Sequence, residues 1–368
     1  MTINVAIFPP ETMKWYGGVE YFCNLISAVK NDLNFYLFLT HKIDPQVYNI
    51  YKDLSVNIIG GVQNPSIGKR IHRIVRLNKI FGLTQKLETM ISDHNIDIIS
   101  HSNLYAKNVP TIYWVPDLQH KHYPEYFTAK EKFIREVSIR VAAKKSSSLI
   151  VSSNFGREDL LLKYPKLNKP VEVLQFCSMH GVNKEIKKEC TENYFVMSNQ
   201  YWKHKNHFIC VEAIKILRDS GIDVKLYFTG GSSHTSNIMF NLKKYIDDNN
   251  LSNDIIFTGF ISTEELIALI GRSVALINPS LFEGWNTSVE LAKNLNTQLI
   301  LSDIPVHREQ CKNSFFFDPR KSQALADGMK IALARTQNPY VAPYEKRANF
   351  FKKRYIEIVE KSLARCGL

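Results

Sequence analysis

The sequence predicts an α/β fold made of two doubly wound, parallel-sheet domains. Short β-branched and aromatic runs alternate with amphipathic stretches of helical length along almost the whole chain, which is typical of parallel strands joined by crossover helices. The alternation stops once, shortly after residue 176, and then restarts. A length of 368 residues is enough for two domains of ordinary size.

In the first half, apolar runs of strand length and stretches with helical periodicity alternate. The predicted strands cover 3–8, 34–39, 55–59, 97–100, 111–115, 148–151 and 171–174, and the predicted helices 18–31, 68–81, 84–94, 130–145 and 154–163.

The second half repeats this pattern. Its predicted strands cover 194–198, 223–229, 254–259, 274–277 and 298–302, and its predicted helices 205–219, 236–249, 263–271, 287–295 and 321–335. We therefore expect a first domain over 1–177, a linker over 178–193, a second domain over 194–343, and a last helix within 344–368 that packs back onto the first domain. Two such domains would face a central cleft that is lined by the carboxyl ends of their strands.

The composition excludes several classes of protein. With 45% apolar and 22% charged residues, the chain is not disordered over any long stretch, and no apolar run reaches the ~20 residues that a bilayer-spanning helix requires. Neither a leader-like amino terminus nor C-x-x-C spacing among the six cysteines is present, so we expect a cytoplasmic protein with reduced thiols. The net charge of +12 requires an explanation.

Two segments of the first domain have residues suited to chemistry. Gly17 and Gly18 follow the first strand and precede a helix, where a backbone can approach a phosphate or sugar closely, although a glycine-requiring turn would explain them too. Residues 116–125 hold Asp117, His120 and His122, which can bind sugar hydroxyls or move protons near neutral pH. A solvated polar loop is the alternative.

The second domain has two further segments of this kind. Residues 198–207 follow its first strand and contain Lys203 and Lys205 beside a helix start, which suits a diphosphate. Residues 279–288 join a strand to a helix that begins near Thr287, and Glu283 and Gly284 within this run could hold sugar hydroxyls and a phosphate together. A basic surface turn and a simple helix cap are the alternatives.

These motifs in this order, together with Thr258-Gly259-Phe260 and Ser302-Asp303-Ile304-Pro305, resemble the family 4 retaining glycosyltransferases of the GT-B fold, also called group 1 glycosyl transferases. The resemblance implies a nucleotide-sugar donor on the second domain, an acceptor on the first, and no divalent metal or other cofactor. Lys205 resembles the lysine that neutralises the donor diphosphate, and Glu283 the acid that contacts donor hydroxyls. The remaining positions that resemble the donor site are Gly17, Gly18, Phe260, Ile261, Gly284, Trp285, Asn286 and Thr287.

The chain departs from the family pattern at three places. The second acid of the family falls on Leu291, and Glu290 stands one residue earlier, about 100° away on a helix. The usual arginine appears as Asn199, which leaves Lys203 or Lys205 to carry the phosphate charge. Pro116, rather than histidine, precedes Asp117, so that His120 or His122 would have to replace it.

We therefore expect a retaining hexosyltransferase that moves one sugar from a nucleotide-sugar to a glycan acceptor, in lipid-linked form, during surface polysaccharide (O-antigen or capsule) synthesis. Retention without an enzymatic nucleophile would require cationic stabilisation of the leaving diphosphate, which Lys205 and the helix start at Thr287 would supply. A degenerate binding protein and a sugar-nucleotide epimerase are the alternatives. A nucleic-acid partner is not expected, because the basic residues form no recognisable module.

Residues 66–81 explain part of the positive charge. Ile67, Ile71 and Ile74 share one helical face, and basic residues such as Lys69 and Arg73 lie mostly opposite, with no acid between them. The segment could rest on an anionic membrane as a peripheral contact at the inner face of the cell membrane. A helix that simply covers the sheet would show the same pattern.

Overall fold

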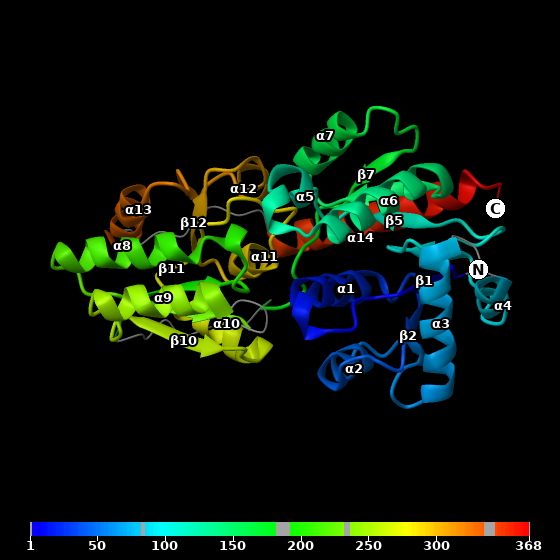
Figure 1. The fold of residues 1–368 in the computed structure, drawn as a ribbon, viewed down its shortest axis with the longest axis horizontal. Coiled ribbons are helices and arrows are strands. Elements are labelled where there is room, and N and C mark those ends of the chain that lie inside the picture. Colours follow the sequence, from blue (N-terminus) through cyan, green and yellow to red (C-terminus); the bar gives the residue numbers. More distant parts are fainter. Residues whose placement is uncertain (1, 82–84, 182–191, 232–235, 335–342, 368) are drawn as a thin grey trace. The chain divides into compact units, whose positions relative to one another are not determined.

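The computed structural model describes residues 2–81, 85–181, 192–231, 236–334 and 343–367, without side chains for 76–81 and 236. It divides into two compact units, residues 1–176 with 347–368 and residues 177–346. Each unit is an α/β structure with parallel strands, as the sequence predicted (Figure 1). Most of the predicted linker, residues 182–191 of 178–193, lies outside the described residues.

Unit 1 is built on two parallel sheets with the strand orders β3-β2-β1-β4 and β5-β6-β7. A single parallel bridge between Ile99 and Thr111 connects the end of one sheet to the start of the other. The strands are β1 (Asn4–Ile7), β2 (Asn34–Leu39), β3 (Asn57–Gly60), β4 (Ile98–Ser100), β5 (Ile112–Trp114), β6 (Ser148–Val151) and β7 (Val171–Val173).

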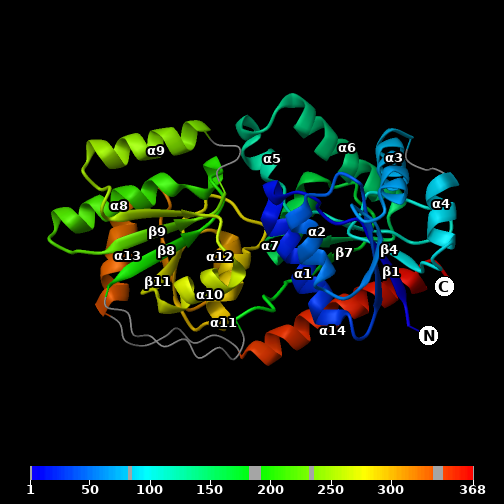
Figure 2. The same cartoon turned by 90° about the horizontal axis from the view of Figure 1, so that it is seen from below.

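Helices cover the sheets of unit 1 (Figure 2). They are α1 (Tyr16–Val29), α2 (Pro45–Lys52), α3 (Pro65–Phe81), α4 (Gln85–Ser92), α5 (Gln119–His122), α6 (Ala129–Lys145) and α7 (Asn154–Lys163), with 3₁₀ turns at Met13–Trp15 and Pro124–Tyr126. The last helix, α14 (Tyr344–Ala364), contacts the same unit: its Tyr355 hydroxyl donates to Ser100 Oγ over 2.8 Å, and Arg354 pairs with Glu172 over 2.7 Å.

Unit 2 is one six-stranded parallel sheet with the order β10-β9-β8-β11-β12-β13. Its strands are β8 (Tyr194–Ser198), β9 (Lys225–Thr229), β10 (Ile255–Gly259), β11 (Ala275–Asn278), β12 (Gln298–Ser302) and β13 (Phe315–Phe317). Its helices are α8 (His207–Asp219), α9 (Ser236–Asp248), α10 (Thr263–Arg272), α11 (Thr287–Asn294), α12 (Pro305–Gln310) and α13 (Ser322–Ala334), with a 3₁₀ turn at Lys203–Lys205.

Alternation along the strands gives the unit 2 sheet two apolar faces. Phe195 and Met197 pack with α8, α9 and α13, whereas Tyr194 and Val196 pack with α10 and α11. Successive strand residues point to opposite faces, and a strand that is buried on both sides therefore has a continuous apolar sequence. This is why the run from Tyr194 to Met197 is read correctly as a central strand.

Besides the 3₁₀ turns, four elements were not predicted: α2, α12, β13 and the four-residue helix α5. The sequence does carry a start signal for α2, because Asp44 caps it by accepting from Gln46 N over 2.9 Å and Pro45 occupies its first position. Helix α12 has six residues and β13 has three, which is too short for apolar periodicity to be recognised.

Helix α3 has its apolar side against the sheet. Ile71 and Ile74 are buried in a core cluster with Ala6 and Phe38. These two residues are therefore unavailable to a bilayer, whereas Ile67 on the same helix is 38% exposed. Among the described residues, no helix has the length and apolarity needed to cross a membrane.

Candidate functional site

The strand order of unit 2 places two loops at one position on the sheet edge. Strands β8, β9 and β10 progress to one side, and β11, β12 and β13 progress to the other, so the order reverses between β8 and β11. Ligands of such sheets bind outside the carboxyl ends of the strands at this switch point. The loops that follow Ser198 and Asn278 therefore define the candidate site of unit 2.

The two loops are joined directly by hydrogen bonds. Leu281 N donates to the His204 carbonyl over 2.7 Å. Asn206, in a left-handed conformation with φ of 59°, donates from Nδ2 to the carbonyls of Pro279 (3.3 Å) and Pro319 (2.8 Å). Asparagine tolerates this conformation better than most residues. These bonds fix the short turn that carries Lys205.

Lys205 and Glu283 form an ion pair, with 2.6 Å between Nζ and Oε1. Both side chains are largely shielded from water. Burial alone would raise the pKa of Glu283, but the adjacent Lys205, together with His204 and His307, outweighs burial and lowers this pKa to about 2. The carboxylate is therefore ionised at neutral pH.

Two further groups donate to the Glu283 carboxylate. Ser280 Oγ lies 2.7 Å and Asn286 Nδ2 3.1 Å from Oε1. Asn286 is also the N-cap of α11, where its Oδ1 accepts from Val289 N over 3.0 Å. Asn286 Nδ2 lies 3.5 Å from Asn199 Oδ1 as well. One side chain thus links the acid, the helix start and the loop after β8.

A polar network behind this loop involves Glu290. Glu290 Oε1 accepts from Lys293 Nζ over 2.8 Å and from Gln310 Nε2 over 2.9 Å. The Gln310 amide also bonds both main-chain groups of Asn286: Nε2 donates to its carbonyl (2.8 Å), and Oε1 accepts from its N–H (3.3 Å). Glu290 is buried in this network, and its predicted contact with a donor stays a prediction.

Leu291 lies in the apolar core, with Val196 and Leu276 in the same cluster. The position at which the family places its second acid therefore faces away from polar groups in this chain. The neighbouring residue, Glu290, is engaged by Lys293 and Gln310, as described above.

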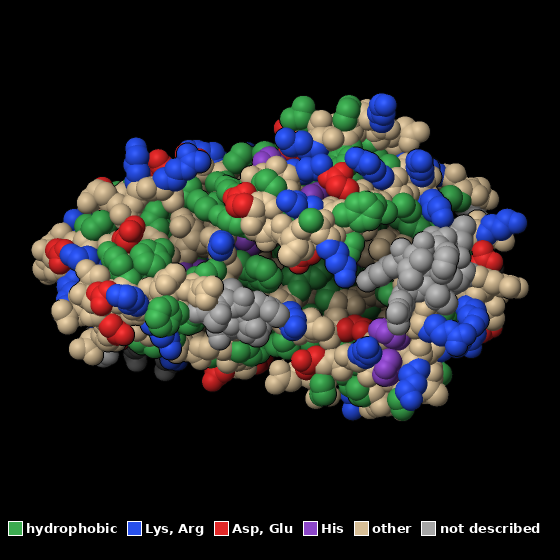
Figure 3. Space-filling view, viewed as in Figure 1, with side chains coloured by type: hydrophobic (Ala, Val, Ile, Leu, Met, Phe, Trp, Pro, Cys, Tyr) green, Lys and Arg blue, Asp and Glu red, His purple; other side chains and the backbone are tan. Residues whose placement is uncertain are grey.

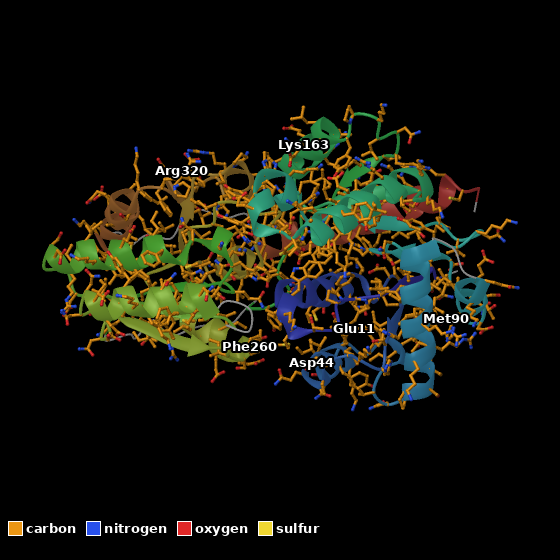
Figure 4. The ribbon with its side chains drawn as sticks, in the orientation of Figure 1. Glu11, Asp44, Met90, Lys163, Phe260 and Arg320 are labelled. Carbon is orange, nitrogen blue, oxygen red and sulfur yellow. The ribbon has the colours of Figure 1, made fainter. Side chains whose placement is uncertain are left out.

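The remaining residues predicted for the donor lie along the same edge of unit 2. Gly284 and Trp285 stand between Glu283 and the N-cap, and Thr287 is the first residue of α11; all three are partly exposed. Lys203 is exposed at the start of the 3₁₀ turn. Phe260 and Ile261 follow β10, and the Phe260 ring is exposed (Figure 4).

In unit 1, the glycine pair lies inside a helix instead of before it. Helix α1 begins at Tyr16, so that Gly17 and Gly18 are in its first turn and the prediction that they precede the helix was wrong. A Cβ on Gly18 would come within 2.7 Å of the Trp15 indole, whereas one on Gly17 would meet nothing within 4 Å. Close packing against Trp15 therefore explains why residue 18 is a glycine. It does not explain why residue 17 is one.

Asp117 and His120 follow β5 and are both held by α6. Asp117 Oδ1 accepts from Gln119 N and from Arg135 Nη1, each over 3.0 Å. His120 is buried with Nε2 3.4 Å from Glu136 Oε1. Burial and the charge of Arg135 lower the pKa of His120, which keeps the imidazole neutral at pH 7.

His122, the alternative to His120, has a different partner. Its Nε2 lies 2.7 Å from Oδ2 of Asp159, a residue of α7. The structure therefore separates the two histidines, with His120 directed to α6 and His122 to α7.

Sequence reasoning missed Ser280 and Gln310. Both are uncharged residues that matter because they bond Glu283 and Asn286, and no spacing rule points to such contacts. Gln310 lies five residues beyond Pro305, which is the last residue of the Ser302-Asp303-Ile304-Pro305 motif. It belongs to α12, a helix that the sequence did not predict.

Comparison with known proteins finds similarity to glycosyltransferases. Residues 182–353 match the family model described as "Glycosyl transferases group 1". The O-antigen chain mannosyltransferase RfbU of Salmonella typhimurium is 23% identical over 338 residues, which cover 89% of this chain and 92% of RfbU.

Solved structures agree on the fold. Anabaena Alr3699/HepE in complex with UDP and glucose superposes with a TM-score of 0.71 at 14% identity, covering 98% of this chain and 100% of HepE. Sucrose-phosphate synthase from Thermosynechococcus elongatus gives 0.66 at 13% identity, covering 99% of this chain and 94% of the synthase. The chain therefore has the GT-B fold, and its residues 182–353 are similar to the group 1 glycosyl transferases.

Proposed function

We propose that this protein is a retaining hexosyltransferase that moves one sugar from a nucleotide-sugar donor to a lipid-linked glycan during surface polysaccharide synthesis. The observation that carries the proposal is the Lys205–Glu283 pair at the switch point of the unit 2 sheet, next to the start of α11. The similarity to an O-antigen chain mannosyltransferase supports a hexose and a polysaccharide product.

In this proposal, Lys205 stabilises the leaving diphosphate. An ammonium has three N–H donors, and Glu283 receives one of them, so that two stay available for phosphate oxygens. The N-terminus of α11 presents backbone N–H groups, which adds positive potential at the same place. Charge that develops on the diphosphate as the glycosidic bond breaks would be stabilised by both.

Glu283 is proposed to accept hydrogen bonds from hydroxyls of the donor sugar. Its lowered pKa makes it an acceptor of hydrogen bonds at neutral pH and a poor proton donor. This fits a positioning role better than general acid catalysis. Transfer with retention then requires no enzymatic nucleophile, and Asp117 and His120 would serve on the acceptor side.

The second candidate function is nucleotide-sugar binding without turnover. It is favoured by one observation, the burial of Leu291 in the apolar core where the family has an acid. Catalysis by a chain that lacks this acid would depend on Lys205 and Glu283.

Incubation with a panel of UDP-, GDP- and dTDP-sugars, with and without a lipid-linked glycan acceptor, tests the proposal. Transfer that is at least 100-fold slower in Glu283→Gln and Lys205→Ala supports it. Tight binding of a donor without transfer or hydrolysis would instead establish the binding protein. Inversion at the anomeric carbon of the product would refute retention.

A further inference from the structure

The outer face of α6 has a cluster of large apolar side chains exposed to solvent. Phe133 is 68% exposed, Ile134 50% and Val137 40%. They lie within little more than one helical turn, and residues three or four apart share a face. Single exposed apolar residues are ordinary, whereas a contiguous group of them marks an interaction surface.

Cations flank this cluster on the same face. Lys130, Arg140 and Lys144 are exposed, and their spacings from Phe133 and Val137 are three, seven or eleven residues, which brings all of them to one side of the helix. Figure 3 shows apolar side chains gathered over α6, with basic side chains around them. We call Lys130, Phe133, Ile134, Val137, Arg140 and Lys144 the α6 outer face.

The acids of α6 do not neutralise the α6 outer face. Glu131 is bound in a capping box with Thr128, where its Oε2 accepts from the Thr128 N–H over 2.8 Å. Glu136 is turned toward α5, accepting from Lys121 and lying 3.4 Å from His120; its 3.6 Å contact with Arg140 is a long one. The α6 outer face is thus positively charged around an apolar centre.

The opposite face of α6 is fixed in unit 1. Ile139 and Ala142 are buried in a core cluster with Leu149 and Leu160. Since the packing of α6 is satisfied by its inner side, the α6 outer face has no part in the core. The α6 outer face is already formed on a packed helix. Binding therefore requires no loss of conformational entropy to order its backbone.

We propose that the α6 outer face docks unit 1 on an anionic lipid surface. An apolar strip between cations inserts into the headgroup region while the cations contact anionic lipids. The chain's net charge of +12 adds long-range attraction. A second copy of this face is a poorer partner, because it would place like charges opposite one another.

This proposal moves the predicted membrane contact from α3 to α6. Both helices are basic, but Ile71 and Ile74 of α3 are buried, whereas Phe133 and Ile134 of α6 are exposed. Among the described side chains, α3 exposes one large apolar residue, Ile67 at 38%, whereas α6 exposes a cluster of three beside its cations. Its inner side holds Asp117 through Arg135, so docking would bring that loop within about one helix diameter, ~10 Å, of the lipid.

Vesicle flotation of the full chain tests the proposal without any activity assay. The vesicles are phosphatidylcholine alone, or phosphatidylcholine with one third phosphatidylglycerol. We expect flotation with the anionic vesicles only. The double variant Phe133→Ser/Ile134→Ser should bind at least tenfold more weakly, because it removes the inserting side chains.

The triple variant Lys130→Gln/Arg140→Gln/Lys144→Gln should also lose binding, by about fivefold per cation and on the order of 100-fold in total. Two matched controls should bind as the wild type does. One is Lys69→Gln/Arg70→Gln/Arg73→Gln, which removes the same charge from α3. The other is Phe240→Ser on α9, whose ring is 67% exposed.

Thermal unfolding of all variants should match the wild type, since every altered side chain is on the surface. The proposal is overturned if the α6 variants float as the wild type does, or if the α3 variant loses as much binding as the α6 variant. It is equally overturned if sedimentation shows a dimer that Phe133→Ser dissociates while no vesicle binding is found, because the surface would then belong to a second copy.

Discussion

The two units use charged residues in different ways at the carboxyl edges of their sheets. In unit 2, Lys205 and Glu283 come from two loops on either side of the switch point and pair with each other. In unit 1, Asp117 and His120 come from one loop and are paired with Arg135 and Glu136 of a helix behind it. Unit 2 thus presents fixed charges, and unit 1 presents a neutral imidazole.

This difference indicates a division of work between the units. A fixed ion pair at a helix start provides electrostatic stabilisation without any proton transfer. A neutral imidazole can accept or donate one hydrogen bond at each nitrogen and suits hydroxyl groups. We therefore expect changes in unit 2 to affect the donor and changes in the unit 1 loop to affect the acceptor.

The largest expected effect is on the ion pair of unit 2. Lys205→Ala and Glu283→Gln should each lower kcat at least 100-fold, because each removes charge that faces the leaving diphosphate or the sugar. Steady-state kinetics with the active donor measures this. Lys215→Ala is the control: it breaks an exposed lysine–aspartate pair on α8 and should leave kcat unchanged. Wild-type rates in both site variants would remove the pair from the site.

A second prediction concerns the buried Lys293–Glu290 pair. Lys293→Met should reduce the free energy of unfolding by about 3 kcal/mol, because it leaves the Glu290 carboxylate buried without its cation. Chemical denaturation measures the loss. The double variant Lys293→Met/Glu290→Leu should recover most of it. If the single and the double variant lose the same free energy of unfolding, the unpaired Glu290 carboxylate is not the cause of the loss.

A third prediction sharpens the role of Gln310 as a positioning residue. Gln310→Ala should raise KM for the donor about tenfold with a smaller change in kcat, because the Asn286 main chain loses both of its bonds to the amide. Gln310→Glu should be no better than Gln310→Ala, because its carboxylate would face the buried Glu290 carboxylate and the Asn286 carbonyl. An effect on kcat alone would contradict a positioning role.

The unit 1 loop should show a smaller and different effect. His120→Gln should raise KM for the acceptor about tenfold and leave donor hydrolysis unchanged, since the imidazole belongs to the other unit. His122→Gln is the matched control, because that histidine pairs with Asp159 on α7. A loss in His122→Gln with none in His120→Gln would reverse the assignment of the two histidines.

The smallest effect is the pH dependence of stability. The folded-state pKa of Glu283 is about 2, below its usual value of 4.5. A group with a lowered pKa stabilises the fold above its unfolded pKa and loses that contribution as the pH falls through its folded pKa. The stability difference between wild type and Glu283→Gln should therefore be constant from pH 7 to about 5 and shrink from there toward pH 2. Thermal unfolding at each pH measures it, and a constant difference would show that Glu283 is not held ionised.

The fold was predictable from the sequence because its signals are local and repeated. Apolar runs such as Tyr194–Met197 and helical periodicity recur throughout, and each is read without knowledge of the rest of the chain. The prediction was wrong for α12 and β13, which are too short for a period to show. The prediction also placed the glycine pair before the helix, because two adjacent glycines usually indicate a turn. In the structure both glycines lie inside α1, where Gly18 packs against Trp15.

The site was predictable in part. Lys205 and Glu283 were predicted because charged side chains stand shortly after strands, and Asn286 was predicted from the family resemblance; the strand order brings their loops together, and their roles stay predictions. Gln310 and Ser280 were not found, because their role depends on which main-chain and carboxylate atoms they contact, and this is decided by packing.

By itself, the sequence determined the α/β class and the order of the elements, because periodicity and chain order are local properties. It also determined the number of basic residues, but it did not decide which of them lie at the donor site or on a membrane-binding surface. The tertiary structure decided that Ile71 of α3 is buried while Phe133 of α6 is exposed, although both helices are rich in basic residues. The physical reason is that burial depends on which face of a helix meets the sheet, and that contact is made with residues far away in the chain.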